Sequence, residues 1–167
     1  MKCIIRERKL KDCKDWINVN VSSWNDNLKG VVSDRLLKII SSNKEERITK
    51  EEESFVKDDN HYVLEEDNRV IGILKIKKSS RNGYEDCGEI QILYLLSSCK
   101  GNGYGKKLLN FAFDKLKEKG FNKIVIGCLE NNSSNEFYKH MGGKFIKQEP
   151  WDIFDEHYIE NLYLYEL

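Results

Sequence analysis

The sequence predicts a mixed α/β domain in which a central sheet carries helices on its faces. Segments with apolar residues at three- and four-residue spacing, typical of helices, alternate with shorter apolar segments that are typical of strands. The predicted order is strand, helices, hairpin, strand, helix, strand, helix, strand and strand. The chain has 167 residues, enough for one domain with its own core, so we expect a single domain over residues 1–167.

The first third of the chain is predicted to be mainly helical. A short strand over residues 3–6 is followed by a helix, which Gly30 can end. The apolar face of this helix is formed by residues at helical spacing: Cys13, Trp16, Ile17, Val21 and Trp24.

A second helix can begin at Ser33 or Asp34, because both side chains can cap a helix N-terminus. Its apolar residues are Leu36, Leu37 and Ile40. The charged segment 41–53 is interpreted as a solvated helix face. We expect Phe55 and Val56 to attach the end of that segment to the core.

The middle of the chain changes from helical to strand periodicity. Residues 61–65 and 70–76 flank Asp67-Asn68, which predicts a hairpin with a tight turn. A polar loop over residues 79–86 follows. The mostly apolar run 89–96 is typical of a central strand that is covered on both faces.

The last third alternates helices and strands. One helix has apolar residues at helical spacing up to Gly120, which can end it: Leu108, Leu109, Ala112, Phe113 and Leu116. A shorter helix begins at Asn132 or Ser133 and ends at Gly142-Gly143. Strands are predicted for residues 123–129, 144–148 and 158–165.

The composition excludes several classes of function. Lys and Arg total 28, as do Asp and Glu, so a formal net charge of zero argues against nucleic acid or an anionic membrane as partner. No stretch has the length and apolarity to span a bilayer, so we expect a soluble, cytoplasmic protein. The three histidines are scattered and the five cysteines lack C-x-x-C spacing, so no metal site or disulfide framework is indicated.

The most informative segment is Lys100-Gly101-Asn102-Gly103-Tyr104-Gly105-Lys106-Lys107, between a predicted buried strand and an amphipathic helix. Glycines let the backbone approach a ligand closely. The first amides of a helix lack intrahelical partners and form an anion site, to which the lysines add positive charge. The segment therefore predicts a phosphate or pyrophosphate site, with a plain strand-to-helix turn as the alternative.

Two common phosphate motifs do not fit this segment. A P-loop would need Gly at Lys100 and Ser or Thr at Lys107. The dinucleotide pattern fails because Lys106 or Leu108 stands where its last glycine is required.

The segment resembles the acyl-CoA loop of the GNAT superfamily of N-acetyltransferases, Gln/Arg-x-x-Gly-x-Gly/Ala, with Lys100 in place of Gln or Arg. Asn131, followed by Phe137-Tyr138 and Gly142-Gly143, is similar to a second element of that family. The resemblance covers nearly the whole chain. It implies a GNAT-like, mostly antiparallel sheet of six to seven strands, with a splay between two central strands.

This resemblance implies that acetyl-CoA is the acyl donor and that no metal is needed. The diphosphate would bind the loop, and the pantetheine arm would pair with the backbone near Leu93, Tyr94 and Leu95, where an amide would polarise the thioester carbonyl. Asn131 would bind the pantetheine through its amide. The implied cofactor-binding residues are Leu93, Tyr94, Leu95, Lys100, Gly101, Asn102, Gly103, Tyr104, Gly105, Lys106 and Asn131.

Two residues are candidates for proton transfer. Tyr138 aligns with the family tyrosine that protonates the departing thiolate, and a phenol is protonated at neutral pH. Its alternative is a core aromatic. Glu89 matches the position of a glutamate used as base in some relatives, and a carboxylate among apolar neighbours can accept a proton near neutrality. Glu89 could also lie in solvent or cap a loop, and Gln91 could hold a water instead.

The acceptor is predicted to be an amine, either a small molecule or a peptide, bound by a monomer or a homodimer. The resemblance implies that the acceptor binds against the first helices and the last strands, where aromatic and acidic groups would suit a cation. The candidates there are Trp24, Asp26, Asn27, Asp34, Trp151, Asp152, Asp155, Glu156, His157 and Tyr158. Core packing for Trp24 and a solvated loop over residues 152–156 are the alternatives. A non-catalytic acyl-CoA sensor and an enzyme for another phosphate ligand are the competing functions.

Overall fold

The structure, a computed structural model, describes residues 2–167 and divides into two compact units. The first unit comprises the chain up to Lys75 together with Ile92–Phe111. The second comprises Ile76–Gln91 together with Ala112–Leu167. No helix among the described residues combines the length and the apolar character that a membrane span requires.

The strands of the first unit form the predicted hairpin and one further pair. β2 (His61–Glu66) is antiparallel to β3 (Arg69–Lys78) and to β1 (Cys3–Glu7). The turn between β2 and β3 places Asp67 at a φ of 48° and Asn68 at 67°. Two consecutive positive φ angles match the twist of the flanking strands, and Asp and Asn tolerate them better than most residues.

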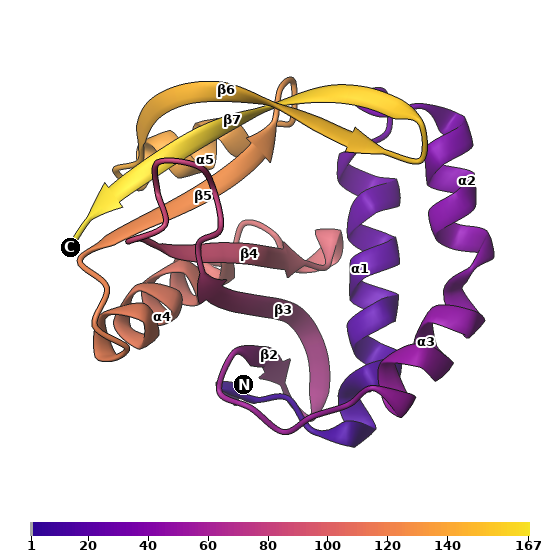
Figure 1. The fold of residues 1–167 in the computed structure, drawn as a ribbon. Coiled ribbons are helices and arrows are strands. Elements are labelled where there is room, and N and C mark those ends of the chain that lie inside the picture. Colours follow the sequence, from indigo (N-terminus) through magenta and orange to yellow (C-terminus); the bar gives the residue numbers. More distant parts are fainter. Residues whose placement is uncertain (1) are drawn as a thin grey trace. The chain divides into compact units, whose positions relative to one another are not determined.

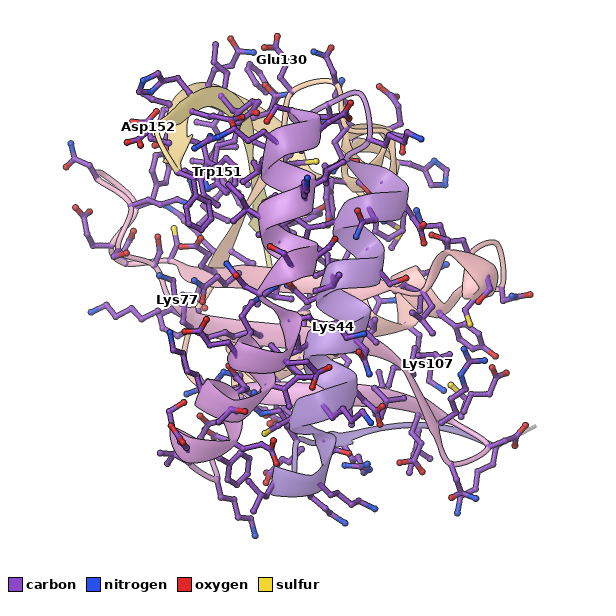
Figure 2. The ribbon with its side chains drawn as sticks, turned by 90° about the vertical axis from the view of Figure 1, so that its right-hand side faces the viewer. Lys44, Lys77, Lys107, Glu130, Trp151 and Asp152 are labelled. Carbon is purple, nitrogen blue, oxygen red and sulfur yellow. The ribbon has the colours of Figure 1, made fainter. Side chains whose placement is uncertain are left out.

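Three helices belong to the same unit: α1 (Cys13–Asn27), α2 (Asp34–Ser42) and α3 (Lys44–Glu53). Figures 1 and 2 show α2 and α3 lying alongside α1. The apolar residues predicted for α1 and α2 are all buried, which confirms their helical spacing. The hydroxyl of Ser33 accepts a hydrogen bond from Leu36 N–H at 3.0 Å, so Ser33 is the cap of α2.

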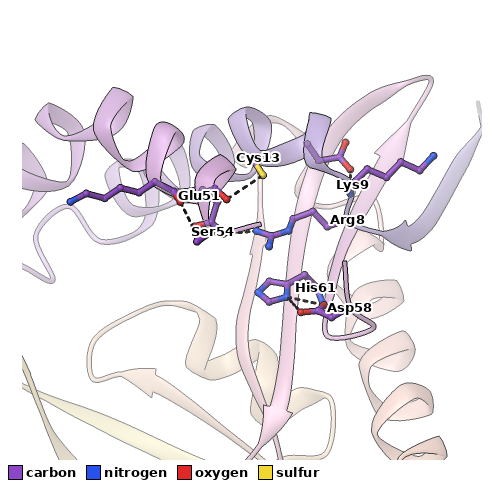
Figure 3. Close-up of polar contacts among 9 residues, drawn as sticks. Arg8, Lys9, Cys13, Glu51, Ser54, Asp58 and His61 are labelled. Carbon is purple, nitrogen blue, oxygen red and sulfur yellow. Dashed lines mark hydrogen bonds and ion pairs between the residues drawn. The ribbon is translucent and has the colours of Figure 1, made fainter. Parts of the chain in front are cut away.

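A buried arginine joins these helices to the strands (Figure 3). Arg8 is 5% exposed, its Nη1 donates to Glu51 Oε1 at 2.5 Å, and its guanidinium lies 4.7 Å from the Trp16 ring centroid. The ring of Phe55 lies 5.4 Å from the same guanidinium. The segment 41–53 is therefore not wholly solvated. The expectation for Val56 was wrong, because this side chain is 68% exposed and cannot attach α3 to the core.

The second unit contains the remaining predicted elements. The long helix over residues 104–118 is divided between the units: Leu108 and Leu109 belong to the first, Ala112 and Leu116 to the second, and all four are fully buried. The short helix packs on two of the strands (Figure 1). Its strands and helices, some shared with the first unit, are β4 (Gly88–Leu95), α4 (Tyr104–Glu118), β5 (Lys123–Leu129), α5 (Ser134–His140), β6 (Lys144–Ile153) and β7 (Glu156–Glu166).

The hairpin of β6 and β7 is longer than predicted. β6 continues past Gln148 through Pro150 to Ile153, and Trp151 pairs with Tyr158. The turn has Phe154 and Asp155 at φ of 46° and 63°. The alternative of a solvated loop over residues 152–156 was therefore wrong about the loop, because three of these residues belong to strands, but Asp152, Phe154 and Asp155 are exposed as it expected. Because β6 is the last strand of the sheet, a proline without an N–H is tolerated there.

Hydrogen-bonded neighbours follow the order β1-β2-β3-β4-β5-β7-β6 in a seven-stranded sheet. The β4–β5 pair is parallel, whereas β1–β2, β2–β3, β5–β7 and β6–β7 are antiparallel. The parallel ladder runs only from Gly88↔Ile124 to Ile90↔Ile126, although both strands continue. This topology confirms the predicted mixed, mostly antiparallel sheet, and the short parallel ladder is consistent with a splay.

Candidate active site

The glycine loop belongs to the first unit and adopts a backbone that only glycine accepts readily. After β4 the chain forms a single 3-10 turn, η2 (Ser97–Cys99), and then enters the loop. Gly101 and Gly103 have φ of +82° and +79°. No atom lies within 4 Å of the position that a Cβ would take on either glycine, so this face of the backbone is open.

The loop leads directly into the N-terminus of α4, a helix of 15 residues. Its first intrahelical hydrogen bond runs from Lys107 N–H to Gly103 O at 3.1 Å. The N–H groups of Tyr104, Gly105 and Lys106 therefore have no acceptor within the helix. Such N–H groups, together with the positive end of the helix dipole, form an anion-binding site.

Side chains from α1 and from the loop itself fix the loop conformation. Lys100 Nζ donates to Asn27 Oδ1, and Ser97 Oγ donates to Asp26 Oδ2 at 2.8 Å. Asn102 Nδ2 donates to Cys99 O at 3.2 Å. The C-terminal end of α1 therefore holds the loop in place through Asp26 and Asn27, two of the residues predicted as candidates for acceptor recognition.

Two further side chains flank the loop. Lys107, labelled in Figure 2, donates from Nζ to the backbone oxygen of Cys3 at 3.2 Å, a neutral partner that leaves its charge available. The hydroxyl of Tyr104 donates to Glu66 Oε1, and this hydrogen bond raises the pKa of Tyr104 to about 12. Tyr104 is therefore a neutral donor throughout the physiological range.

Leu93, Tyr94 and Leu95 lie at the end of β4, in the first unit. Because the β4–β5 ladder ends at Ile90, none of the three takes part in it. Leu95 is buried, and the other two are half-buried.

Glu89 lies at the other end of β4, in the second unit, and is 5% exposed. Its Oε2 accepts a hydrogen bond from Arg81 Nε at 3.1 Å. Its Oε1 is buried and has no hydrogen-bond partner within the described part of the chain. The alternative that Glu89 lies in solvent was therefore wrong, whereas Gln91 is exposed.

Arg81, which the sequence did not single out, is the centre of a cluster of carboxylates. Its Nη1 donates to Glu149 Oε2 at 2.7 Å and to Glu160 Oε1 at 2.5 Å. Burial alone would lower the pKa of Arg81, but Glu160, Glu89 and Glu149 outweigh burial and raise it. Burial works to raise the pKa of Glu149, and hydrogen bonds from Lys147 and Arg81 outweigh it, so this pKa is lowered.

Tyr138 lies on α5 and is 7% exposed. Its ring centroid is 5.4 Å from that of Phe137 and 6.3 Å from that of Tyr163, so the ring also serves the packing of this unit. Asn131 is exposed in the turn before α5 with a φ of +70°, a conformation that asparagine tolerates better than most residues. Asn131 therefore precedes α5, whereas Tyr138 lies within it.

Asn135 fixes α5 and was not predicted. Its Nδ2 donates to Leu129 O at 2.9 Å and to Asn132 O at 2.7 Å. Its Oδ1 accepts from Asn161 Nδ2 at 3.0 Å and from Tyr163 Oη at 2.7 Å. The full hydrogen-bonding capacity of the amide is used, so Asn135 ties α5 to β5 and β7. An asparagine in the first turn of a helix is common, and only its burial distinguishes it.

The predicted acceptor residues are distributed over both units. Trp24 is buried in the first unit, which agrees with core packing, and Asp34 is exposed at the start of α2. In the second unit the rings of Trp151 and Tyr158 lie 6.1 Å apart. Asp152, labelled with Trp151 in Figure 2, bonds His157 Nδ1 at 2.8 Å and raises the pKa of that histidine.

Comparison with known proteins agrees with this arrangement. Residues 32–142 match the model of the acetyltransferase (GNAT) family. An uncharacterised N-acetyltransferase of Bacillus subtilis is 27% identical over 154 residues, which cover 89% of this chain and 84% of the relative.

Two solved structures show the same fold. The PaiA N-acetyltransferase of Thermoplasma acidophilum, solved in complex with coenzyme A, has a TM-score of 0.73 at 22% identity, with 100% of both chains covered. A GCN5-related N-acetyltransferase of Rhodopseudomonas palustris has a TM-score of 0.79 at 13% identity, with 100% of this chain and 97% of that chain covered. Because the family match spans more than half of its residues, the chain belongs to the GNAT family of acetyltransferases.

Proposed function

We propose that this enzyme transfers an acetyl group from acetyl-CoA to the primary amine of a small-molecule or peptide acceptor. The observation that carries the proposal is the pair of left-handed glycines, Gly101 and Gly103, directly before the N-terminus of α4. The open backbone face and the unpaired helix amides fit the diphosphate of coenzyme A. The complex of the Thermoplasma acidophilum relative with coenzyme A supports this assignment.

The proposed cofactor residues divide into three groups. The N–H groups from Gly103 to Lys106 donate to the diphosphate, and the backbone of Leu93, Tyr94 and Leu95, with the amide of Asn131, binds the pantetheine arm. Lys100, Gly101 and Asn102 shape the loop, because the side chains of Lys100 and Asn102 are engaged with Asn27 and with Cys99 O.

Two side chains are proposed to move protons. Acetyl-CoA supplies the acetyl group as an activated thioester. Glu89 Oε1 accepts a proton from the acceptor ammonium, which leaves a neutral amine with a free lone pair. The hydroxyl of Tyr138 donates a proton to the sulfur as the carbon–sulfur bond breaks, and it regains one from the nitrogen that has formed the new amide. The net products are the N-acetylated acceptor, coenzyme A with its thiol, and the proton that Glu89 returns to water.

The acceptor is proposed to be cationic before it reacts. The exposed carboxylates of Asp34 and Asp155 and the neighbouring rings of Trp151 and Tyr158 support this proposal, because acidic and aromatic groups suit a cation. Release of the coenzyme A thiol, measured with a panel of amines, identifies the acceptor. Binding of acetyl-CoA without thiol release on any amine would instead indicate an acyl-CoA sensor.

The binding assignment is tested with two glycines that have nearly the same φ angle. Gly103→Ala adds a Cβ at a φ of +79°, and Gly30→Ala adds one at a φ of +82° in the same unit, in both cases with no atom within 4 Å. Each variant should lose roughly 1–2 kcal/mol of folding stability. Only Gly103→Ala should lose affinity for coenzyme A in a titration. Equal affinity of the two variants, or equal stabilisation of the wild type by ATP or NAD, would contradict the proposal.

A further inference from the structure

Only one of the two carboxylate oxygens of Glu89 has a hydrogen-bond partner in the described part of the chain. The side chain is 5% exposed, so the surrounding protein shields most of the carboxylate from solvent. Oε2 is bound by Arg81, while Oε1 has no hydrogen-bond partner among residues 2–167. Folded proteins satisfy nearly all buried polar atoms, so an unpartnered carboxylate oxygen requires an explanation, and a base that takes a proton from its substrate is one.

The guanidinium that holds Glu89 is itself fixed in orientation. Nε points to Glu89, and Nη1 is bound by Glu149 and Glu160. Because a guanidinium is planar, fixing Nη1 also fixes the direction of the Nε–H bond. Lys147 Nζ lies 3.0 Å from Glu149 Oε1 and completes the cluster.

The loop that carries Arg81 is also fixed. Arg81 N–H donates to the hydroxyl of buried Ser79 at 3.1 Å, and Ser79 N–H donates to Cys87 O at 2.9 Å, which closes the base of the loop. On β5, Gly127 makes room for the cluster, since a Cβ there would lie 2.4 Å from Glu160 Oε2 and 2.6 Å from Arg81 Nη2.

We propose that Arg81 is a positioning residue, which holds Glu89 by Oε2 so that Oε1 is presented to the acceptor ammonium. This inference rests on the proposed role of Glu89 as the base. Glu149 and Glu160 orient Arg81 and do not touch the substrate. Without the guanidinium, three carboxylates would share the cluster with Lys147 alone, and Glu89 would lose both its orientation and its neutralising neighbour.

Steady-state kinetics over a range of pH test this role. Arg81→Met should lower kcat about 10- to 100-fold, leave KM for acetyl-CoA within about 2-fold, and move the acidic limb of the kcat/KM profile to higher pH. Arg81→Lys should recover part of the kcat and of the pH profile, because it restores the positive charge without the fixed Nε–H. Wild-type kcat and an unchanged pH profile in Arg81→Met would overturn the inference.

Arg8→Met is the matched control, because Arg8 is also a buried, ion-paired arginine but contacts Glu51 instead. This control should lower Tm and leave kcat and the pH profile unchanged. If Arg81→Met does not fold, Arg81→Lys carries the test, and a wild-type pH profile and kcat in that variant would count against the inference.

Glu89→Gln separates the inference from the proposed function. If Glu89→Gln keeps the wild-type kcat, Glu89 is not the base, and the proposed role of Arg81 is also wrong. If Glu89→Gln is inactive and Arg81→Met is not, only the inference is wrong. The expected result is that both variants are impaired and that the double variant is no slower than Glu89→Gln, because both changes act on one proton transfer.

Discussion

The glycine loop and the Arg81 cluster are built in opposite ways. The loop is a contiguous segment, Lys100 to Lys106, and its function is assigned to backbone N–H groups that one stretch of sequence positions. The cluster joins Arg81 and Glu89, which are 8 residues apart, to Glu149 and Glu160, which lie 68 and 79 residues from Arg81, and all four act through side chains. The difference suggests a division of roles, in which local backbone binds the cofactor and long-range ion pairs prepare the chemistry.

The largest expected effect separates binding from chemistry. Tyr138→Phe keeps the ring that packs near Tyr163 and removes only the hydroxyl, so kcat should fall about 100-fold or more. The affinity for coenzyme A should not change, because the Tyr138 hydroxyl is not among the groups proposed to bind it. Both are measured by initial rates and by titration. A loss of affinity with an unchanged kcat would break the proposed division of roles.

A glycine in the cluster should respond differently from a glycine in the loop. Gly127→Ala places a Cβ 2.4 Å from Glu160 Oε2, so we expect a loss of about 1–3 kcal/mol from overpacking. The same change should lower kcat, because Arg81 must move. Chemical denaturation and kinetics measure the two effects. A fully stable, fully active Gly127→Ala variant would show that the cluster tolerates displacement.

Acid should lower the folding stability in two pH ranges, one set by a histidine and the other by carboxylates. Burial lowers the pKa of His61 in the first unit below its ordinary value of 6.5, despite the opposing contact with Asp58. The unfolded chain therefore binds the proton more readily, and stability is lost as the pH falls below about 6.5. The lowered pKa of Glu149 in the second unit also makes stability fall with falling pH. This loss begins only near pH 4.5, the ordinary pKa of a glutamate.

Tm measured between pH 7 and pH 5 tests the contribution of His61. His61→Gln should flatten this dependence. His157→Gln is the control, because the effect of His157 on stability has the opposite sign. Asp152 raises the pKa of His157, so the stability that this histidine contributes is present at low pH and disappears as the pH rises. A steeper fall of Tm on acidification in His61→Gln than in wild type would refute the assignment.

The smallest effect is expected at the end of α3. Val56→Ser should change stability by no more than about 0.5 kcal/mol, because the side chain is 68% exposed. Phe55→Ala should cost more, since its ring lies against the Arg8 guanidinium. Thermal unfolding distinguishes the two.

Local patterns predicted most of the fold. These patterns are the apolar spacing in α1, α2 and α4, the Asp67-Asn68 turn and the glycine loop. Each is formed by residues close together in the chain, so it can be recognised from the sequence alone. The extension of β6 through Pro150 was missed, because only the sheet order shows that this strand is at the edge.

The Arg81 cluster could not be predicted either, because the folded sheet, and not the neighbouring sequence, brings its residues together. Arg81 lies in a polar loop whose sequence has no periodicity, and its three partners come from β4, β6 and β7. Nothing local distinguishes Glu89, whose Oε1 is buried without a partner, from a glutamate in solvent. Asn135 was missed similarly, since its hydrogen bonds depend on the packing of α5 against β7.

The most direct test of the central claim is a crystal structure of the protein with coenzyme A. We expect the diphosphate oxygens to lie within about 3.2 Å of backbone nitrogens between Gly103 and Lys106, with Gly101 and Gly103 still at positive φ. A diphosphate bound elsewhere, or a loop whose amides are covered by side chains in the complex, would contradict the account.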